Sequence, residues 1–348
     1  MTSAPTPPTI IAGRYEVLRP LGSGSFGEVY EVHDHTLDTR CALKLLANGI
    51  LFGPWSESQV LRGLRGEYIM PILNADVVAG QRYVVTEVMT GGTVDNHLSP
   101  GLGMATEQAV RWTREACQGI ARVHDHGLIH GDIKPGNLFL DHRGEVLVGD
   151  FGLAQQLGAD GCAKAVGTRE TMAPEVAAAG VPPVTTNLTY TVGSDVYSLG
   201  ATLFWMLAGE PPLAGVASYD LLATQSRPDI WERAPHIPRG LRDVVNRAIA
   251  FDPADRPASA IELAAALGRY RAPARRWTRI APHPGHEQCF TGVKGASKIE
   301  VCAVPDGSRP IAIVARQAGS GRKVRKAARS CSRSDLSKFL RSAFKVCD

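Results

Sequence analysis

Glycines near the start of the chain have the spacing of a phosphate-binding loop. Gly22, Gly24 and Gly27 lie in the segment 21–29, between two strand-like runs. Glycine lets backbone N–H groups approach phosphate oxygens because no Cβ stands in the way. Glycine supplies 36 of the 348 residues. This spacing therefore arises by chance about 0.4 times in such a chain, and a flexible hairpin explains the motif alone equally well. A dinucleotide-binding loop runs from a strand into a helix, so the flanking strands disfavour that interpretation.

Oxygen ligands and an amine further along the chain could complete a phosphate site. Asn137 and Asp150 offer an amide and a carboxylate oxygen, which are ligands that Mg²⁺ prefers. Lys44 ends a strand-like run, where a lone lysine is usually a solvated surface charge. It needs a partner, and Glu57 is the next acidic residue along the chain. Phosphoryl transfer requires mainly positioning and charge neutralisation, which such a set can supply.

The elements that would position these residues divide the chain into two parts. Residues 15–88 have the pattern of short β-rich runs broken by one helical stretch, and the pattern becomes helical from residue 106. Apolar residues then recur at steps of three and four, which predicts a helix with one buried face. They are Ala109, Trp112, Ala116, Ile120 and Val123. Gly127 is placed to end this helix. The sequence predicts a small strand-rich lobe followed by a larger helical lobe.

Taken in order, the motifs resemble the series found in eukaryotic-like Ser/Thr protein kinases of the bacterial type. The similar segments are the V-A-I-K strand at 41–44, the catalytic loop H-R-D-x-x-x-x-N at 130–137, D-F-G at 150–152, A-P-E at 173–175, the helix beneath the catalytic loop at 194–200, and a late arginine, Arg256, that pairs with Glu175. The resemblance covers residues 13–269. It implies an α+β, bilobed protein-kinase fold with an N-lobe over 13–89 and a C-lobe over 90–269.

This resemblance also implies the reaction, with ATP and Mg²⁺ (or Mn²⁺) as cofactors and a protein hydroxyl as acceptor. Asp132 is expected to accept the hydroxyl proton, Lys134 to contact the γ-phosphate, and Thr168 to brace both. Asn137 and Asp150 are expected to hold the metal ion. A lysine at position 134 and the Gly-Thr pair before A-P-E are typical of Ser/Thr kinases and differ from tyrosine kinases.

The remaining expected site residues surround the nucleotide. They are Gly22, Gly24 and Gly27 over the phosphates, Lys44 on the α- and β-phosphates, Glu57 paired with Lys44, Val29, Ala42 and Phe139 around the adenine ring, Thr86 as gatekeeper, and the backbone of Glu87 and Met89 at the adenine edge. For the apolar members of this set, plain core packing is the alternative. Only 13 positions separate Lys44 from Glu57, so the segment between them is shorter than is usual in the family.

Three departures from the family pattern, at Gly131, Thr171 and Arg169, concern regulation and substrate choice, and Thr171 stands where the family often has tyrosine. Gly131 replaces the arginine that normally receives a phosphorylated activation loop, so we expect the phosphate-ordered switch to be weak or absent. Apart from Thr168, Thr171 is the only hydroxyl residue from 153 to 172. We therefore expect any autophosphorylation in this loop to fall on Thr171, with little effect on rate. Arg169 stands where proline is common, which leaves the protein substrate and its pathway open.

Two other functions remain open from the sequence. Aminoglycoside and choline phosphotransferases also carry an H-G-D-x-x-x-x-N loop, but Lys134, the segments 173–175 and 194–200, and Arg256 argue against a small-molecule kinase. A pseudokinase used as a binding module is the second alternative. The presence of Lys44, Asp132, Asn137 and Asp150 argues against it.

The charge of the chain is divided unevenly. Residues 1–269 carry a net charge of −8, whereas residues 270–348 carry 17 Lys and Arg against 5 Asp and Glu. We expect a disordered leader at 1–12, a linker at 270–286, and a small basic accessory domain of ββα type at 287–348. Its strands are predicted at 298–304 and 311–316. An amphipathic helix capped by Ser334 is predicted to follow them.

The function of this tail is open. Its basic segment, 322–326, could bind nucleic acid or another acidic partner, could dock on the acidic body, or could be a solvated face. His283, His286 and Cys289 are spaced three apart, and Cys302, Cys331 and Cys347 lie elsewhere in the tail, so zinc or two disulfides are alternatives, but zinc ligands usually come in tighter pairs. We therefore expect ordinary thiols, reduced in a cytoplasmic protein. Neither a signal peptide nor a membrane-spanning run is apparent, and no membrane partner is expected.

Overall fold

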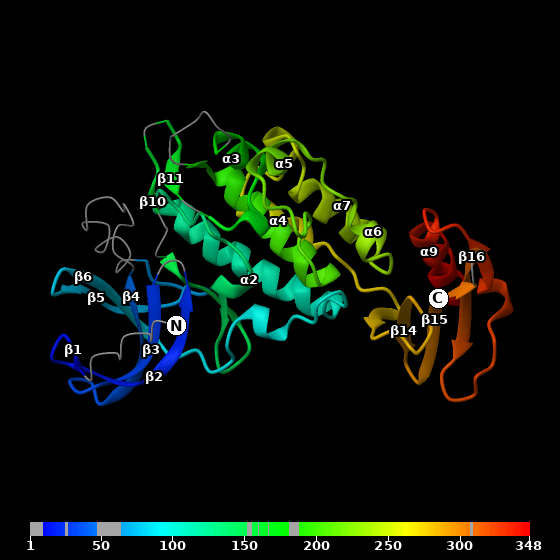
Figure 1. Ribbon diagram of the computed structural model, residues 1–348, viewed down its shortest axis with the longest axis horizontal. Helices are drawn as coiled ribbons and strands as arrows, with labels where there is room; N and C mark the ends of the chain where they lie inside the picture. Colours follow the sequence, from blue (N-terminus) through cyan, green and yellow to red (C-terminus); the bar gives the residue numbers. More distant parts are fainter. Residues whose placement is uncertain are drawn as a thin grey trace, which may run out of the picture.

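The chain forms a strand-rich lobe, a helical lobe and a small tail domain, which follow one another along the molecule (Figure 1). The computed structural model describes residues 10–24, 27–46, 64–151, 155–158, 160–165, 167–180, 188–306 and 309–348. The predicted α+β class with two lobes is confirmed.

The strand-rich lobe is one antiparallel sheet with the strand order β1-β2-β3-β4-β6-β5. Its strands are β1 (Ile10–Ile11), β2 (Tyr15–Gly24), β3 (Gly27–Asp34), β4 (Thr39–Leu46), β5 (Ile72–Val78) and β6 (Gln81–Glu87). One face carries a core of large side chains that includes Tyr15, Leu43 and Val85. Because side chains alternate between the faces of a sheet, the residues between them point the other way.

The prediction of a disordered leader at 1–12 is wrong at its end. Ile10 pairs with Glu16 and Ile11 pairs with Tyr15, and the Ile11 side chain is buried in the core of the sheet. Burial of this apolar side chain extends the sheet by one short strand. Residues 1–9 lie outside the described residues.

The helical lobe begins after the 3-10 helix at Val94–His97. Its helices are α2 (Thr106–Asp125), α3 (Pro174–Ala179), α4 (Val192–Ala208), α5 (Tyr219–Thr224), α6 (Ile230–Arg233), α7 (Arg239–Ala248) and α8 (Ala260–Gly268). Short strands lie between α2 and α4: β7 (Leu128–Ile129), β8 (Leu138–Leu140), β9 (Val146–Val148), β10 (Gln155–Gln156), β11 (Ala163–Ala165) and β12 (Leu188–Tyr190). Among the described residues, no helix has the length and apolarity that crossing a membrane would take.

The predicted amphipathic helix is confirmed as α2. All five apolar residues named for its buried face are buried, and they pack into the core of the helical lobe. Gly127 has a φ of 69°, and its N–H donates to the carbonyl of His124 at 2.9 Å. A glycine reaches this left-handed conformation without a steric penalty, which is why the chain can turn sharply here into β7.

Helix α4 lies in the centre of the lobe and is buried along nearly its whole length. Thr191 and Ser194 form a capping box at its start, with the Ser194 N–H donating to Thr191 Oγ1 at 3.2 Å. Gly209 ends it with a φ of 79°. Both ends are fixed by their own sequence, so the residues of the first turn are held in place.

The tail domain is a five-stranded antiparallel sheet covered by one helix (Figure 1). Its elements are β13 (Arg276–Ile280), β14 (Gln288–Lys294), β15 (Ser297–Asp306), β16 (Arg309–Gln317), β17 (Arg329–Cys331) and α9 (Leu336–Cys347). The two predicted strands lie within β15 and β16, and the predicted helix is α9. Leu340, Ala343 and Phe344 of α9 are buried against the sheet.

Three details of the predicted tail are wrong. The domain is not of ββα type, because its sheet has five strands. Residues 270–286 are not a linker throughout, because Arg276–Ile280 form β13 and pair with β14. The buried Arg275 guanidinium fixes the start of this strand by donating to the carbonyls of Cys347 and Gly292 at 2.9 and 3.1 Å. Ser334 does not cap α9, since the N-cap residue is Asp335.

The tail domain contacts the helical lobe at α6. Arg341 of α9 stacks over the Trp231 ring with its guanidinium 4.3 Å from the ring centre. Arg279 donates to the carbonyl of Arg233 at 3.3 Å. The His236 ring lies 5.5 Å from the Phe290 ring of β14. Docking on the body was one of the alternatives left open for the tail, and the contacts described here use residues outside the segment 322–326.

Candidate active site

The catalytic loop, residues 130–137, is held to helix α4 by a single buried carboxylate. Asp195 accepts hydrogen bonds from the backbone N–H of His130 at 2.9 Å and of Gly131 at 3.0 Å. His124 Nε2 lies 2.9 Å from the same side chain. Burial alone would raise the pKa of Asp195, but the hydrogen bonds from His124 and the loop lower it below its usual value. Asp195 thus remains an anion that fixes the loop.

Gly131 has a φ of 76°, in the left-handed region that favours glycine. The residue that departs from the family pattern therefore suits the backbone conformation of the loop. No side chain can project from this position, so the chain has no guanidinium here to receive a phosphate.

The carboxylate of Asp132 is fixed from three directions. The N–H of Thr168 donates to Oδ1 at 2.9 Å, and the Asn137 amide donates to Oδ2 at 2.9 Å. Lys134 Nζ lies 2.9 Å from Oδ2 and donates to Thr168 Oγ1 at 2.7 Å. Asp132 is only 3% exposed. The structure brings together all four residues predicted to be catalytic.

Lys44 and Asp150 meet across the two lobes. Lys44 Nζ donates to Asp150 Oδ1 at 2.6 Å. The N–H of Gly149 donates to the carbonyl of Asn137 at 3.1 Å, which places Asp150 at the same end of the β8–β9 hairpin as Asn137. The predicted partner of Lys44, Glu57, lies outside the described residues.

The sheet of the small lobe presents its second face to this ion pair. In the register of the strands, Val29 lies opposite Lys44, Lys44 opposite Val84, and Ala42 opposite Thr86. Directly paired residues project to the same face. The predicted nucleotide-binding residues Val29, Ala42, Lys44 and Thr86 therefore line one face, and the apolar core occupies the other.

The glycine-rich hairpin joins β2 and β3 above this face. Gly22 pairs with Val29, and Gly24 pairs with Gly27. At Gly27, where φ is 135°, a Cβ would lie 1.9 Å from the carbonyl oxygen of Leu45. At Gly22 a Cβ would meet nothing within 4 Å. Of these two glycines, Gly27 is required by the packing of the sheet and Gly22 is not.

The other predicted adenine contacts lie where the lobes join. Glu87 ends β6, and the carbonyl of Met89 accepts the N–H of Gly92 at 3.1 Å in the turn that follows. Phe139 lies in β8, bridges to Thr93 and is half-buried. A Cβ on Gly149 would lie 2.9 Å from the Phe139 ring, so the small residue before Asp150 lets the ring pack there.

Thr171 does not have the exposure that phosphorylation requires. Its side chain is 2% exposed, and its carbonyl accepts the Ser198 hydroxyl at 2.9 Å. The predicted autophosphorylation on Thr171 would first need this segment to leave the α4 surface. The structure therefore disfavours this part of the expectation.

The sequence did not reveal the role of Asp195 or of His124. Asp195 belongs to the motif 194–200, but its spacing alone does not say which backbone groups it binds. His124 lies four residues after Ile120, on the buried face of α2. The spacing could have indicated that His124 is aimed into the lobe.

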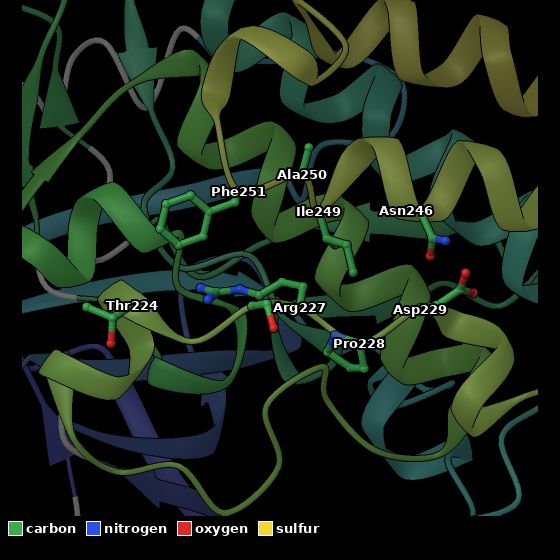
Figure 2. A pocket seen from close by; sticks show the side chains of 9 residues that line it. Thr224, Arg227, Pro228, Asp229, Asn246, Ile249, Ala250 and Phe251 are labelled. Carbon is green, nitrogen blue, oxygen red and sulfur yellow. The ribbon is translucent and has the colours of Figure 1, made fainter. Parts of the chain in front are cut away.

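A separate cavity of about 500 Å³ opens on the helical lobe, between the α5–α6 connection and the end of α7 (Figure 2). Its lining comprises Thr224, Ser226, Arg227, Pro228, Asp229, Asn246, Ile249, Ala250 and Phe251. Arg227, at its wall, donates to the carbonyl of Leu222 at 2.9 Å and to the Tyr197 hydroxyl. None of the predicted site residues lines this cavity.

Comparison with known proteins identifies the class. The model of the protein kinase domain matches residues 15–266, and the chain belongs to this family. The tail domain lies beyond the match.

Three similar proteins are bacterial. The chain is 28% identical over 269 residues to the serine/threonine-protein kinase PrkC of Bacillus subtilis, an alignment that covers 73% of this chain and 40% of PrkC. It is 31% identical over 296 residues to the DNA damage-responsive serine/threonine-protein kinase RqkA of Deinococcus radiodurans, covering 79% and 42%. It is 30% identical over 282 residues to the serine/threonine-protein kinase PknB of Mycobacterium tuberculosis, covering 76% and 44%. The chain thus spans about two fifths of the length of these relatives.

Proposed function

We propose that this protein is a Ser/Thr protein kinase that transfers the γ-phosphate of Mg-ATP to a protein hydroxyl. The observation that carries this proposal is the fixed carboxylate of Asp132, with Lys134, Asn137 and Thr168 bound around it. Family membership and the names of the relatives support the same activity.

Asp132 is the group that orients the acceptor hydroxyl and accepts its proton. Its carboxylate is held by Thr168 and Asn137, so it need not reorganise during the reaction. Lys134 is bound to both Asp132 and Thr168, which holds its ammonium group beside the proposed proton acceptor. There its positive charge would stabilise the negative charge of the γ-phosphate during transfer. A lysine at this position also suits a Ser or Thr acceptor.

The oxygen ligands fit a hard divalent cation such as Mg²⁺. Asn137 Nδ2 donates to the backbone carbonyl and to the carboxylate of Asp132, which leaves the amide oxygen as the side that a cation can use. Asp150 supplies a carboxylate beside it. A bound ion would neutralise charge on the phosphates. Lys44 would take the α- and β-phosphates in place of the Asp150 oxygen that it now contacts.

The experiment that tests the proposal follows label from γ-labelled ATP into generic protein substrates and, separately, into aminoglycosides. We expect transfer to Ser and Thr of protein, and Asp132→Asn lowers kcat by about 10²–10⁴-fold because the proton acceptor is lost. Asp125→Asn is the matched control, since Asp125 is exposed at the end of α2. Label in aminoglycosides would favour the small-molecule kinase. ATP binding without turnover in the wild type would favour a pseudokinase.

The exposed basic residues of the tail are a separate proposal within this function. Arg322, Lys323, Arg325 and Lys326 are exposed, and the contacts with α6 use Arg279 and Arg341 instead. This leaves the segment 322–326 available for an acidic partner, as the sequence suggests. Its electrostatic contribution would weaken as salt is raised.

A further inference from the structure

Four potential metal ligands of the tail domain converge on one point. The ligand atoms of His283, His286, Cys289 and Cys302 all lie within 4.8 Å of one another. The two histidines come from the connection between β13 and β14, Cys289 lies in β14, and Cys302 lies in β15. Cys289 and Cys302 are directly opposite each other in the strand register. The cluster therefore joins one loop to two strands.

The spacing within the cluster is that of a coordination shell. His286 Nδ1 lies 3.3 Å from Cys289 Sγ, and His283 Nδ1 lies 3.5 Å from the same sulfur. His283 Nδ1 lies 3.7 Å from Cys302 Sγ. In tetrahedral zinc, with Zn–S near 2.3 Å and Zn–N near 2.0–2.1 Å, neighbouring ligand atoms are about 3.4–3.8 Å apart. These three distances correspond to edges of such a tetrahedron, and the other three pairs of ligand atoms lie within 4.8 Å of each other.

The surroundings favour a closed site. Cys289 is 0% exposed and Cys302 is 6% exposed, while both histidines are half-buried and cover the sulfurs from the loop. The His283 N–H also lies 3.5 Å from Cys289 Sγ, which is a contact that a thiolate would accept. All seven cysteines are free thiols, so the pair is not already a disulfide. A disulfide would not explain why the Nδ1 atoms of both imidazoles point at the sulfurs.

We propose that His283, His286, Cys289 and Cys302 bind one zinc ion, through both Nδ1 atoms and both sulfurs. Two sulfurs and two nitrogens in tetrahedral arrangement select Zn²⁺ among the common divalent ions. Four protein ligands leave no open position, so the site is structural. The sequence favoured ordinary thiols because these ligands do not form tight pairs along the chain. The strand register supplies the pairing instead.

Zinc at this place would hold a small domain together. The apolar core beneath α9 is modest, and domains of this size often depend on a metal or disulfides. The site also fixes the loop that leads from β13 to β14, where the Glu287 N–H donates to Ala303 at 2.9 Å. Since β13 and β14 carry Arg279 and Phe290, metal binding supports the face that contacts α6.

The test measures zinc in the full-length protein, purified without chelator or metal-affinity tag, by elemental mass spectrometry. We expect one zinc per chain in the wild type and in Cys331→Ser, a buried thiol of the same domain outside the cluster. Cys302→Ser and the milder His286→Gln should each bind at least tenfold less zinc, with circular dichroism reporting whether the chain remains folded. Cobalt substitution should give sulfur-to-metal charge-transfer absorption that weakens in Cys302→Ser.

A second measurement separates the metal from the fold. A strong chelator should lower the melting temperature of the wild type and of Cys331→Ser, but not that of His286→Gln. A zinc-free wild type whose thiols all react with a thiol reagent would overturn the proposal. So would zinc retained in both cluster variants, or a Cys289–Cys302 disulfide found in peptides by mass spectrometry.

Discussion

Arg256 shows at the scale of a single residue how the helical lobe is closed. Its side chain is 0% exposed and forms two hydrogen bonds of 2.7 Å with the carboxylate of Glu175. It also donates to the carbonyls of Ala250, Gly193 and Phe251. The pair joins the start of α3 to the segment before α8. A late arginine therefore holds the A-P-E segment next to the catalytic loop.

Glu175→Ala should destabilise the protein by about 2–3 kcal/mol, because it leaves a buried guanidinium without its anion. The loss is smaller than for a fully buried pair because the Glu175 side chain is 31% exposed and the three carbonyls remain. Thermal melting should show a midpoint lower by roughly 5–10 °C. Glu170→Ala, at an exposed acidic residue of the same segment, is the control. Equal melting temperatures for the two variants would contradict this account.

At the scale of elements, the glycine-rich hairpin contains two glycines with different physical roles. Gly27 lies so close to Leu45 of β4 that a Cβ would collide with its carbonyl, whereas the space around Gly22 is open. The requirement at Gly27 comes from strand packing. The described atoms impose no such requirement at Gly22, and under the proposed function the phosphates of ATP would lie close to this glycine.

Gly27→Ala should therefore separate β3 from β4 and lower the melting temperature, and it should also raise the KM for ATP. Gly22→Ala should leave the melting temperature unchanged, because its Cβ meets no atom. Calorimetry and initial-rate kinetics measure the two effects. A stable Gly27→Ala protein with ordinary KM would mean that the hairpin readily shifts away from Leu45.

The elements also show where sequence reasoning succeeds and where it ends. The order of the motifs predicted the two lobes. It also predicted that Asp132, Lys134, Asn137 and Thr168 belong to one site, because each motif has a characteristic local geometry. Strands β13, β14 and β17 were not predicted. β13 is rich in arginine and is ordered through its pairing with β14 and the buried Arg275. Pairing between strands that are distant in sequence cannot be predicted from the local pattern of residue types.

Contacts between segments that are distant in sequence also could not be predicted. Asp195 binds the catalytic loop across more than sixty residues, and the zinc ligands meet only because β14 and β15 have a particular register. A one-residue slip would move Cys302 to the opposite face. These sites depend on registers and helix rotations that the sequence does not specify by itself.

At the scale of the whole molecule, His236 lies at the contact between the helical lobe and the tail. Its ring packs on Phe290, and its Nδ1 is buried with no hydrogen-bond partner among the described residues. Burial, and to a lesser degree the charge of Arg279, lowers the pKa of His236 to about 3. The contact therefore requires a neutral imidazole.

Acid should weaken the protein through this residue. The unfolded chain takes up a proton at His236 below a pH of about 6.5, whereas the folded chain takes it up only below a pH of about 3. The free energy of unfolding therefore decreases as the pH is lowered from 6.5 toward 3. The loss attributable to His236 is about 2 kcal/mol at pH 5. Melting temperatures from pH 7 to 5 should fall less steeply in His236→Leu than in the wild type.

His142→Leu is the control for that comparison, since the His142 side chain is 77% exposed. Its slope should equal that of the wild type. An unchanged slope in His236→Leu would show that the contact with Phe290 tolerates an imidazolium.

The hydrogen bonds that hold residues 130–137 to Asp195 have a consequence for the regulation of such an enzyme. The Asp195 carboxylate, which is part of the fold, holds the loop through the N–H groups of His130 and Gly131. Gly131 has no side chain that could bind a phosphate added to the chain. Under the proposed function, we therefore expect the loop 130–137 to keep its conformation in the unphosphorylated protein.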